Sequence, residues 1–233
     1  IFHLSLQPAD WWVLGATRNF QFGGGQREVS AKTLAKAFYD PRGSDNDASV
    51  DEESGNQVAS LSSQMHFAAP WPFTFNLEIA GEDTSNNKEY QLGNPALSAG
   101  LYFPSFGVRG LGATFEYSEW DNGWYINNVD QEGYSNEGYV LGHWAMQEQH
   151  YISRAAPGHS QYIAFDYVFN DQHRAVIDVR TAEHQIDEWG RYQRLHAEYT
   201  WSPSRWQVSL GLTVGEDSLG ETLDEAKIAI RWR

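Results

Sequence analysis

The sequence predicts an all-β protein, a transmembrane antiparallel β-barrel, from three observations. Apolar and polar side chains alternate along many short segments with a period of two, which is the period of a β-strand. The apolar faces of these segments end in aromatic residues, as expected at the two membrane interfaces of a barrel. The polar faces carry charges in segment after segment, which are costly in a dry core and tolerated in a water-filled lumen.

The alternation predicts eleven strands. In the clearest one, Trp206, Leu210 and Val214 alternate with small or polar residues, so that one face is large and apolar. A soluble β-sandwich is the alternative, because its strands alternate as well; the aromatic ends and the charged faces favour the barrel. In chain order the predicted strands are Phe2 to Gln7, Trp11 to Phe22, Asn56 to Phe67, Phe73 to Ile79, Ala96 to Phe103, Leu111 to Tyr117, Ser160 to Asn170, Arg174 to Thr181, Leu195 to Trp201, Trp206 to Val214 and Ala226 to Trp232.

The links between these strands alternate between short and long. Bacterial barrels have short turns at the periplasmic end and long loops outside. The short links are Pro8 to Asp10, Ala68 to Pro70, Pro104 to Gly107, Asp171 to His173 and Ser202 to Arg205. The long ones are Gly23 to Gly55, Glu82 to Asn94, Glu119 to His159, Ala182 to Gly190 and Gly215 to Leu223.

Strict alternation requires residues 119–159 to form one extracellular excursion that folds into or over the barrel mouth, although Tyr139 to Ala145 looks locally strand-like. The last strand then runs inward and ends near Trp232. A closed bacterial barrel needs an even number of strands. We therefore expect residues 1–233 to be one barrel domain that lacks an odd number of upstream strands.

The extracellular loop 23–55 is predicted to contain one short helix, residues 31–39. Ser30 is a good N-cap, Leu34 and Phe38 lie on one face, and Pro41 stops the helix. The acidic stretch that follows begins with Asp45 and Asp47, but it lacks the glycine and the terminal glutamate of a calcium loop. A plain solvated loop is therefore the better interpretation.

Composition excludes several classes of protein. Only 41% of the 233 residues are hydrophobic, and no apolar run reaches the ~20 residues of a membrane-spanning helix. A net charge of −15 disfavours nucleic acid as a partner, because phosphates require clustered Lys and Arg. The absence of cysteine excludes disulfides and thiolate metal sites.

No enzyme signature emerges, so we predict no catalytic residues, no cofactor and no metal. His159 and Ser160 are adjacent, but no GxSxG motif is present and no third group is evident that would orient the histidine. His143 has no second ligand at a metal-binding spacing on the same element. Carboxylates that face the lumen are more often paired with arginine than used in glycoside hydrolysis. The polar residues predicted to line the lumen are Arg18, Glu78, Glu82, Asp83, Glu116, Arg180 and Glu198.

Several segments resemble the Wzi capsule assembly family, in the same order as in that family. They are Gly15 to Gly25 (GATRNFQFGGG), Ser30 to Tyr39, Asn56 to Leu61 (NQVASL), Glu78 to Asp83 (EIAGED), Phe115 to Tyr117 (FEY) and Asn122 to Trp144, which includes EGYVLGHW. The resemblance implies an eighteen-stranded barrel of the bacterial outer membrane that binds capsular polysaccharide at the cell surface. This chain would supply the C-terminal part of such a barrel.

The excursion also has the composition of a sugar-binding surface. Sugars stack their C–H faces on aromatic rings and pair their hydroxyls with carboxylates, amides and arginine. The residues predicted to bind polysaccharide are Trp120, Trp124, Tyr125, Tyr134, Tyr139, His143 and Trp144; the alternative is that these rings only plug the barrel mouth. The predicted function is thus a non-catalytic lectin that contacts polysaccharide and outer-membrane lipid. A porin or oligosaccharide channel is the alternative.

Overall fold

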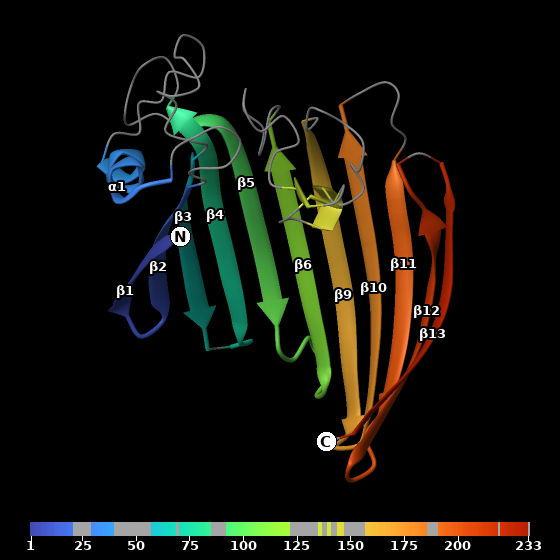
Figure 1. Cartoon of the computed structure of the whole chain (residues 1–233). Helices are drawn as coiled ribbons and strands as arrows, with labels where there is room; N and C mark the ends of the chain where they lie inside the picture. The colour runs from blue at the N-terminus through green and yellow to red at the C-terminus, as the bar shows by residue number, and fades with distance from the viewer. Residues whose placement is uncertain are drawn as a thin grey trace. The chain divides into compact units, whose positions relative to one another are not determined.

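The structure, a computed structural model, describes residues 1–20, 29–39, 57–68, 70–84, 92–121, 135–136, 139–140, 144–146, 157–185, 191–218 and 220–232. Within these residues the protein is almost entirely β-structure (Figure 1). No helix among them combines the length and the apolar character needed to cross a membrane.

Eleven antiparallel strands form one sheet, in the order β1-β2-β3-β4-β5-β6-β9-β10-β11-β12-β13. Each corresponds to one predicted strand, so the all-β antiparallel class is confirmed; closure into a barrel stays a prediction. The strands of this sheet are β1 (Phe2–Ala9), β2 (Trp12–Phe20), β3 (Gln57–Phe67), β4 (Phe73–Thr84), β5 (Leu92–Phe103), β6 (Leu111–Trp120), β9 (Gly158–Asn170), β10 (His173–His184), β11 (Tyr192–Trp201), β12 (Trp206–Glu216) and β13 (Thr222–Trp232).

Several strands are longer than predicted, and this shortens the long links. β4 continues to Thr84 and β5 begins at Leu92, although the alternation of large apolar side chains fades before these ends. β12 and β13 leave a link of only Asp217–Glu221. There the Asp217 carboxylate accepts a hydrogen bond from the backbone N–H of Glu221 (2.8 Å), and Gly220 adopts a positive φ of 80°. The prediction of a long link at this position was wrong.

The chain divides into two compact units. Unit 1 comprises Ile1–Ser63, Glu78–Leu97 and Glu119–Pro157, and unit 2 comprises Gln64–Leu77, Ser98–Ser118 and Gly158–Arg233. Unit 2 includes the five consecutive strands β9 to β13, which form four antiparallel pairs with registers that are regular over most of their length.

In unit 2 the short links and the end of the last strand share one end of the strands. His173, at the start of β10, lies opposite Trp201, at the end of β11. Trp206, at the start of β12, lies opposite Trp232, at the end of β13. The last strand therefore runs toward the end that carries the short turns, as the alternation of link lengths predicts.

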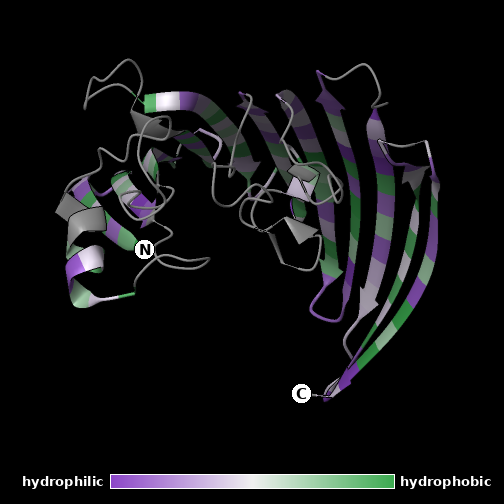
Figure 2. Ribbon diagram, turned by 45° about the horizontal axis from the view of Figure 1, so that its top comes forward, coloured by the Kyte–Doolittle hydropathy of each residue, from purple (hydrophilic) through white to green (hydrophobic). Residues whose placement is uncertain are grey.

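In the strands of unit 2, the apolar side chains are more exposed to solvent than the polar side chains that alternate with them. Leu195, Tyr199 and Trp201 of β11 are exposed, whereas Arg194, His196 and Glu198 between them are less accessible. The alternation is visible in the hydropathy colours of the strands (Figure 2). We call these the apolar face and the polar face. The exposed side chains of the apolar face include Ile163, Phe169, Ile177, Val179, Leu195, Tyr199, Trp201, Trp206, Leu210, Leu212, Val214, Ile228, Ile230 and Trp232. A soluble β-sandwich would bury this face.

A row of phenylalanines runs across the apolar face of unit 2 near the short links. Their rings are in contact in series, from Phe67 to Phe73 at 4.5 Å between centroids and from Phe73 to Phe103 at 5.6 Å. The series continues through Phe106, Phe115 and Phe165. A band of aromatic side chains at one end of the strands is the pattern found at a membrane interface.

In unit 1, the register of β1 and β2 shows which residues share a face. Phe2 lies opposite Arg18 and Leu4 lies opposite Ala16, so Arg18 shares a face with the apolar side chains of β1. His3 and Thr17, which occupy the other face, are joined by a hydrogen bond of 2.9 Å. Arg18 was predicted to line the lumen with the other polar residues. That assignment to the lumen stays a prediction.

The predicted helix is present as α1 (Ala31–Tyr39). The Ser30 hydroxyl accepts a hydrogen bond from the backbone N–H of Thr33 (3.2 Å), and the Ser30 carbonyl accepts one from the N–H of Leu34 (3.0 Å). Ser30 is thus the N-cap that the sequence indicates. The side chain of Phe38 and the acidic stretch after Pro41 lie outside the described residues.

The connection between β6 and β9 adds no strand to the main sheet, since these two strands are neighbours in it. Its described parts are a small hairpin of β7 (Ser135–Asn136) and β8 (Tyr139–Val140) and the 3-10 helix η2 (Trp144–Met146). The strand-like stretch from Tyr139 therefore begins with a strand that pairs with β7. Its position over a barrel mouth stays a prediction.

Candidate functional site

The polar face of unit 2 is the part of the described structure that gathers the most interacting charged side chains. It is built by the in-strand alternation, which turns Asp178, Arg180, Arg194 and His196 to one side of β10 and β11. The cross-strand register then sets Arg180 opposite Arg194 and Asp178 opposite His196. Residues that are directly opposite in an antiparallel pair share a face and approach closely.

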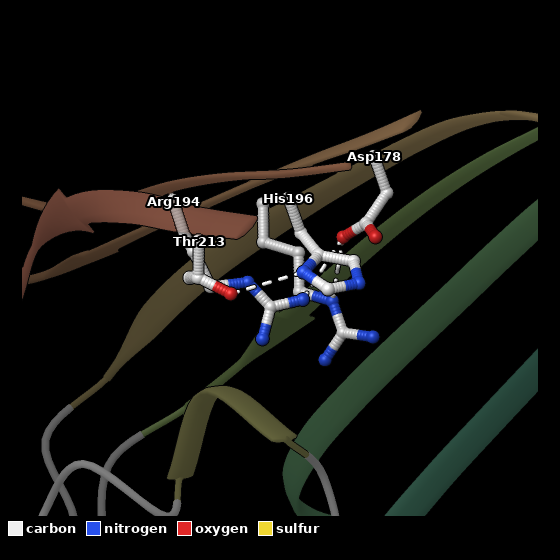
Figure 3. Close-up of polar contacts among 5 residues, drawn as sticks. Asp178, Arg194, His196 and Thr213 are labelled. Carbon is white, nitrogen blue, oxygen red and sulfur yellow. Dashed lines mark hydrogen bonds and ion pairs between the residues drawn. The ribbon is translucent and has the colours of Figure 1, made fainter. Parts of the chain in front are cut away.

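Asp178 forms the centre of this face. Its Oδ1 atom lies 2.9 Å from Nη2 of Arg194 and 3.5 Å from Nε of Arg180 (Figure 3). The Asp178 side chain is only 6% exposed, whereas those of Arg180 and Arg194 are 29% and 22% exposed. The carboxylate is therefore nearly buried, and the two guanidinium groups remain partly accessible.

Arg180 has a second support, an aromatic ring. Its guanidinium carbon lies 4.9 Å from the centre of the Tyr162 ring, on the neighbouring strand β9, and Tyr162 is its direct register partner. A cation over a ring face is attracted by the ring quadrupole. The ring therefore restrains the position of the guanidinium.

Beside the arginines lies a hydrogen-bonded pair. Nδ1 of His196 lies 2.9 Å from the hydroxyl of Thr213 on β12, as Figure 3 shows next to Asp178 and Arg194. Further along the same face, Thr200 donates a hydrogen bond to Glu198 (3.1 Å) and pairs with Ser209 (3.0 Å). These polar side chains are thus hydrogen-bonded to one another across the strands.

Toward the short links, Arg174 pairs with Asp166 at 3.3 Å. Asp166 occupies the space beside Gly112 of β6, where a Cβ atom would collide with its carboxylate. Gln64 and Asn76, on β3 and β4, continue the polar face with a hydrogen bond of 2.8 Å. Ser98 and Ser118 do the same on β5 and β6 at 3.0 Å.

At the end of the strands that lies away from the short links, polar side chains replace the apolar ones on the apolar face. Thr181 and Glu183 follow Val179 on that face of β10, and Glu183 accepts contacts from Arg191 (3.2 Å) and His159 (3.8 Å). His184, the last residue of β10, lies beyond the apolar stretch of its strand. Burial, with a smaller contribution from the charge of His159, lowers the pKa of His184 from 6.5 to about 4.

The predicted lumen residues have different outcomes. Glu116, Arg180 and Glu198 lie on the polar face with the residues above, and Glu78 continues the alternation of β4 in unit 1. The side chains of Glu82 and Asp83 lie outside the described residues. Arg18 lies on the apolar side of β2. The ion pairs of Asp178 were missed, because they depend on how β10 and β11 are aligned.

The predicted polysaccharide-binding residues lie mostly outside the described part of the chain. Trp120, at the end of β6, is 4% exposed, so its ring is covered. Trp144 begins η2 and is partly exposed. The side chains outside the described residues are those of Trp124, Tyr125, Tyr134, Tyr139 and His143.

Two arrangements bear on catalysis and metal binding. His159 and Ser160 alternate to opposite faces of β9; Ser160 is buried and His159 contacts Glu183, so the two do not form a nucleophile and base. In the described ranges, no group of three or more His, Cys, Asp and Glu side chains is placed to hold a metal ion.

The comparisons with known proteins give one match. A family model described as "Capsule assembly protein Wzi" matches residues 2–216, a range that runs from the start of β1 to the end of β12. No curated protein and no solved structure matches the chain.

Proposed function

Because the chain belongs to the Wzi capsule assembly family, we propose that it is a non-catalytic lectin that anchors capsular or extracellular polysaccharide at the bacterial cell surface. The family match over residues 2–216 is the observation that carries this proposal. Members of this family are capsule assembly proteins of the outer membrane, and a polysaccharide is the molecule that capsule assembly handles.

The inverted faces of unit 2 support an outer-membrane setting. Leu212 and Ile230 are among many large apolar side chains that are exposed on one face, and water would make such a surface costly. Hydrocarbon removes that cost, and charged groups such as Asp178 then face away from lipid. We propose that the strands cross the bilayer as part of a closed barrel, with lipid against the apolar face.

Sugar binding is assigned to the ring-rich connection between β6 and β9. Trp124, Tyr125 and Trp144 offer stacking surfaces for the C–H faces of sugars, and the neighbouring acidic and amide side chains offer partners for hydroxyls. Trp120 is better assigned to packing, since its ring is covered. Each contact is individually weak, and a long polymer strengthens retention by engaging many protein copies at once.

The test is a retention assay in encapsulated cells that carry only the variant protein. Replacing Trp124, Tyr125 and Trp144 together with alanine is expected to shift polysaccharide from the cell surface to the medium, with cell-bound polymer falling roughly tenfold because multivalency amplifies each lost contact. The control is Trp71→Ala, which removes an exposed ring from the short link between β3 and β4. Unchanged retention in the triple variant, with normal heat-modifiable migration of the folded protein, contradicts the proposal.

A diffusion channel is the second candidate, and the charged polar face is the observation that favours it, since such a face also suits a water-filled passage. Single-channel recording in planar bilayers separates the two. A stable open conductance favours the channel, whereas little current favours the lectin. Release of reducing ends from polysaccharide by the purified protein would contradict the non-catalytic part of the proposal.

A further inference from the structure

We propose that an apolar groove on unit 2 holds one fatty-acyl chain of a phospholipid from the periplasmic leaflet of the outer membrane. The inference rests on the bilayer setting proposed above and goes beyond it, because it assigns one lipid molecule to one place on the apolar face. The groove extends over β6 and β9 to β13. Its volume is about 740 Å³, which lies within the range of roughly 300–1,000 Å³ that small-molecule sites occupy.

Two alanines form part of the floor of the groove, because each lies between two large side chains. The larger register partners are Tyr167 and Tyr199 for Ala175, and Ile177 and Leu212 for Ala197. Ala175 and Ala197 are diagonal neighbours on β10 and β11, so the two depressions adjoin. The groove is therefore a consequence of side-chain size along the cross-strand rows.

The lining of the groove offers hydrocarbon and almost no polar surface. Glu198 and Lys227 contribute to the lining, but the alternation of their strands directs their charged ends to the polar face. The Tyr199 hydroxyl is hydrogen-bonded to Nδ1 of His173. An alkyl chain is thus the ligand that the groove accepts without leaving a buried polar group unsatisfied.

The position of the groove along the strands matches the start of an acyl chain. Two residues after Tyr199 on the apolar face comes Trp201, and four residues after Ile228 comes Trp232, whose ring contacts Trp206. Aromatic rings of this kind lie at the headgroup level of a membrane barrel. At about 3.3 Å per residue, the groove lies roughly 7–13 Å along the strands from these rings. Short links mark the periplasmic end of a bacterial barrel, where the leaflet consists of phospholipid.

The short links at this end of unit 2 have the charge that a phospholipid headgroup requires. Arg205 lies in the link between β11 and β12, two strands that line the groove. Arg109 lies two residues before Leu111, which also lines the groove. Both arginines are exposed, and Asp171 is the one acidic residue in the short links of unit 2. Guanidinium groups bind phosphate through paired N–H donors, so the charge of the links complements the headgroup of the lipid.

The test measures lipid binding to the full natural protein by native mass spectrometry, with the protein released from detergent micelles. The probe is dipalmitoyl phosphatidylglycerol. We expect one tightly bound molecule of this lipid per protein. Dihexanoyl phosphatidylglycerol, which has the same headgroup on short chains, is expected to bind much more weakly, and so is dipalmitoylglycerol, which has the same chains without the phosphate.

The variants place a ring inside or outside the groove. Ala197→Phe fills the groove and is expected to weaken binding of the long-chain phospholipid about tenfold, the equivalent of about two fewer buried methylene groups. Ala16→Phe is the matched control, because it adds the same ring to the apolar face of β2 in unit 1; its binding is expected to equal that of the wild type. Ala197 is exposed, so the added ring requires no repacking of a core. Heat-modifiable migration checks that both variants are folded, and the smaller change Ala197→Leu is expected to weaken binding by a smaller factor.

Several results overturn the inference. Equal binding of the long-chain and short-chain lipids, or wild-type binding by folded Ala197→Phe, shows that no acyl chain occupies the groove. Equal binding of dipalmitoylglycerol excludes the phospholipid assignment. A broad series of bound lipids without one tight molecule indicates an ordinary surrounding lipid layer only, and a dimer that Ala197→Phe separates assigns the groove to a second copy of the chain.

These results are distinguishable from a failure of the proposed function. Reconstitution of the wild-type protein into lipid vesicles tests the bilayer setting, and the retention assay with the ring variants tests the lectin. A protein that inserts into vesicles and retains polysaccharide, but binds no single phospholipid, would keep its proposed function and lose the groove as a lipid site.

Discussion

Arg180 and Arg194 are direct register partners on β10 and β11, and one oxygen of Asp178 lies within 3.5 Å of both side chains. Such a pair of like charges is tolerated because the shared carboxylate is nearly buried between them. The stability of this part of the sheet therefore depends on these three residues together.

Replacing Asp178 with asparagine is expected to destabilise the protein by about 2 kcal/mol, because two opposed guanidiniums lose their counter-charge. The cost stays below that of a fully buried pair because both arginines are partly exposed. The measurement is the urea dependence of tryptophan fluorescence in detergent micelles. Arg174→Gln, which breaks a more exposed pair, is expected to cost well under half as much; equal costs for the two variants would argue against a central role of Asp178.

The apolar face gives a prediction about the membrane. Leu210 is exposed in the middle of β12, and Ser209 beside it lies on the polar face. Leu210→Arg is expected to destabilise the protein in lipid vesicles by roughly 2–4 kcal/mol, since an arginine near the bilayer midplane meets hydrocarbon. Ser209→Arg is expected to cost about 1 kcal/mol, mainly through its hydrogen bond to Thr200. If Leu210→Arg were neutral, that face would not contact lipid.

Gly215 is predicted to be a required glycine. A Cβ atom at this position would collide with the backbone carbonyl oxygen of Gln193 and lie 2.9 Å from Cα of Arg194. Gly215→Ala is therefore expected to push β12 away from β11 and to cost about 1–3 kcal/mol in a urea unfolding assay. Gly100→Ala is the control, because its Cβ atom would meet its nearest neighbours at 3.6 Å. Equal stability of both variants would contradict the close approach of the strands.

The lowered pKa of His184 predicts that the stability of the protein depends on pH. Its pKa falls from 6.5 in the unfolded chain to about 4 in the folded protein, because burial disfavours the charged ring. Its stabilising contribution is complete above pH 6.5 and is lost as the pH falls from 6.5 toward 4, by about 3 kcal/mol at most. The urea midpoint across this range measures the loss. His184→Gln is expected to remove most of the slope, and an unchanged slope would assign it to other groups.

The strands were predictable because the evidence for each one is local. In β11 and β12 every second side chain reports the face on which it lies, so the pattern in a single segment is sufficient. The N-cap of α1 is local as well, since Ser30 and Thr33 are three residues apart. These features need no information about which segment lies alongside.

The candidate site was only partly predictable because it depends on register. Arg180, Glu116 and Glu198 were identified as polar-face residues from their own strands. The pairing of Arg180 with Arg194 depends on the alignment of two strands, which the alternation alone leaves open by steps of two residues. The face of Arg18 depends on register in the same way, since β1 places it opposite Phe2.

The series of phenylalanine rings from Phe67 to Phe165 has a consequence for how the sheet sits in the bilayer. Each ring touches the next, so a strand that slid along its neighbour by two residues would break the series of contacts. In the outer-membrane setting proposed above, the row would lie at a single depth, so that the ring contacts and the bilayer favour the same alignment of these strands. In a thinner or thicker membrane, the whole row is expected to shift as one body.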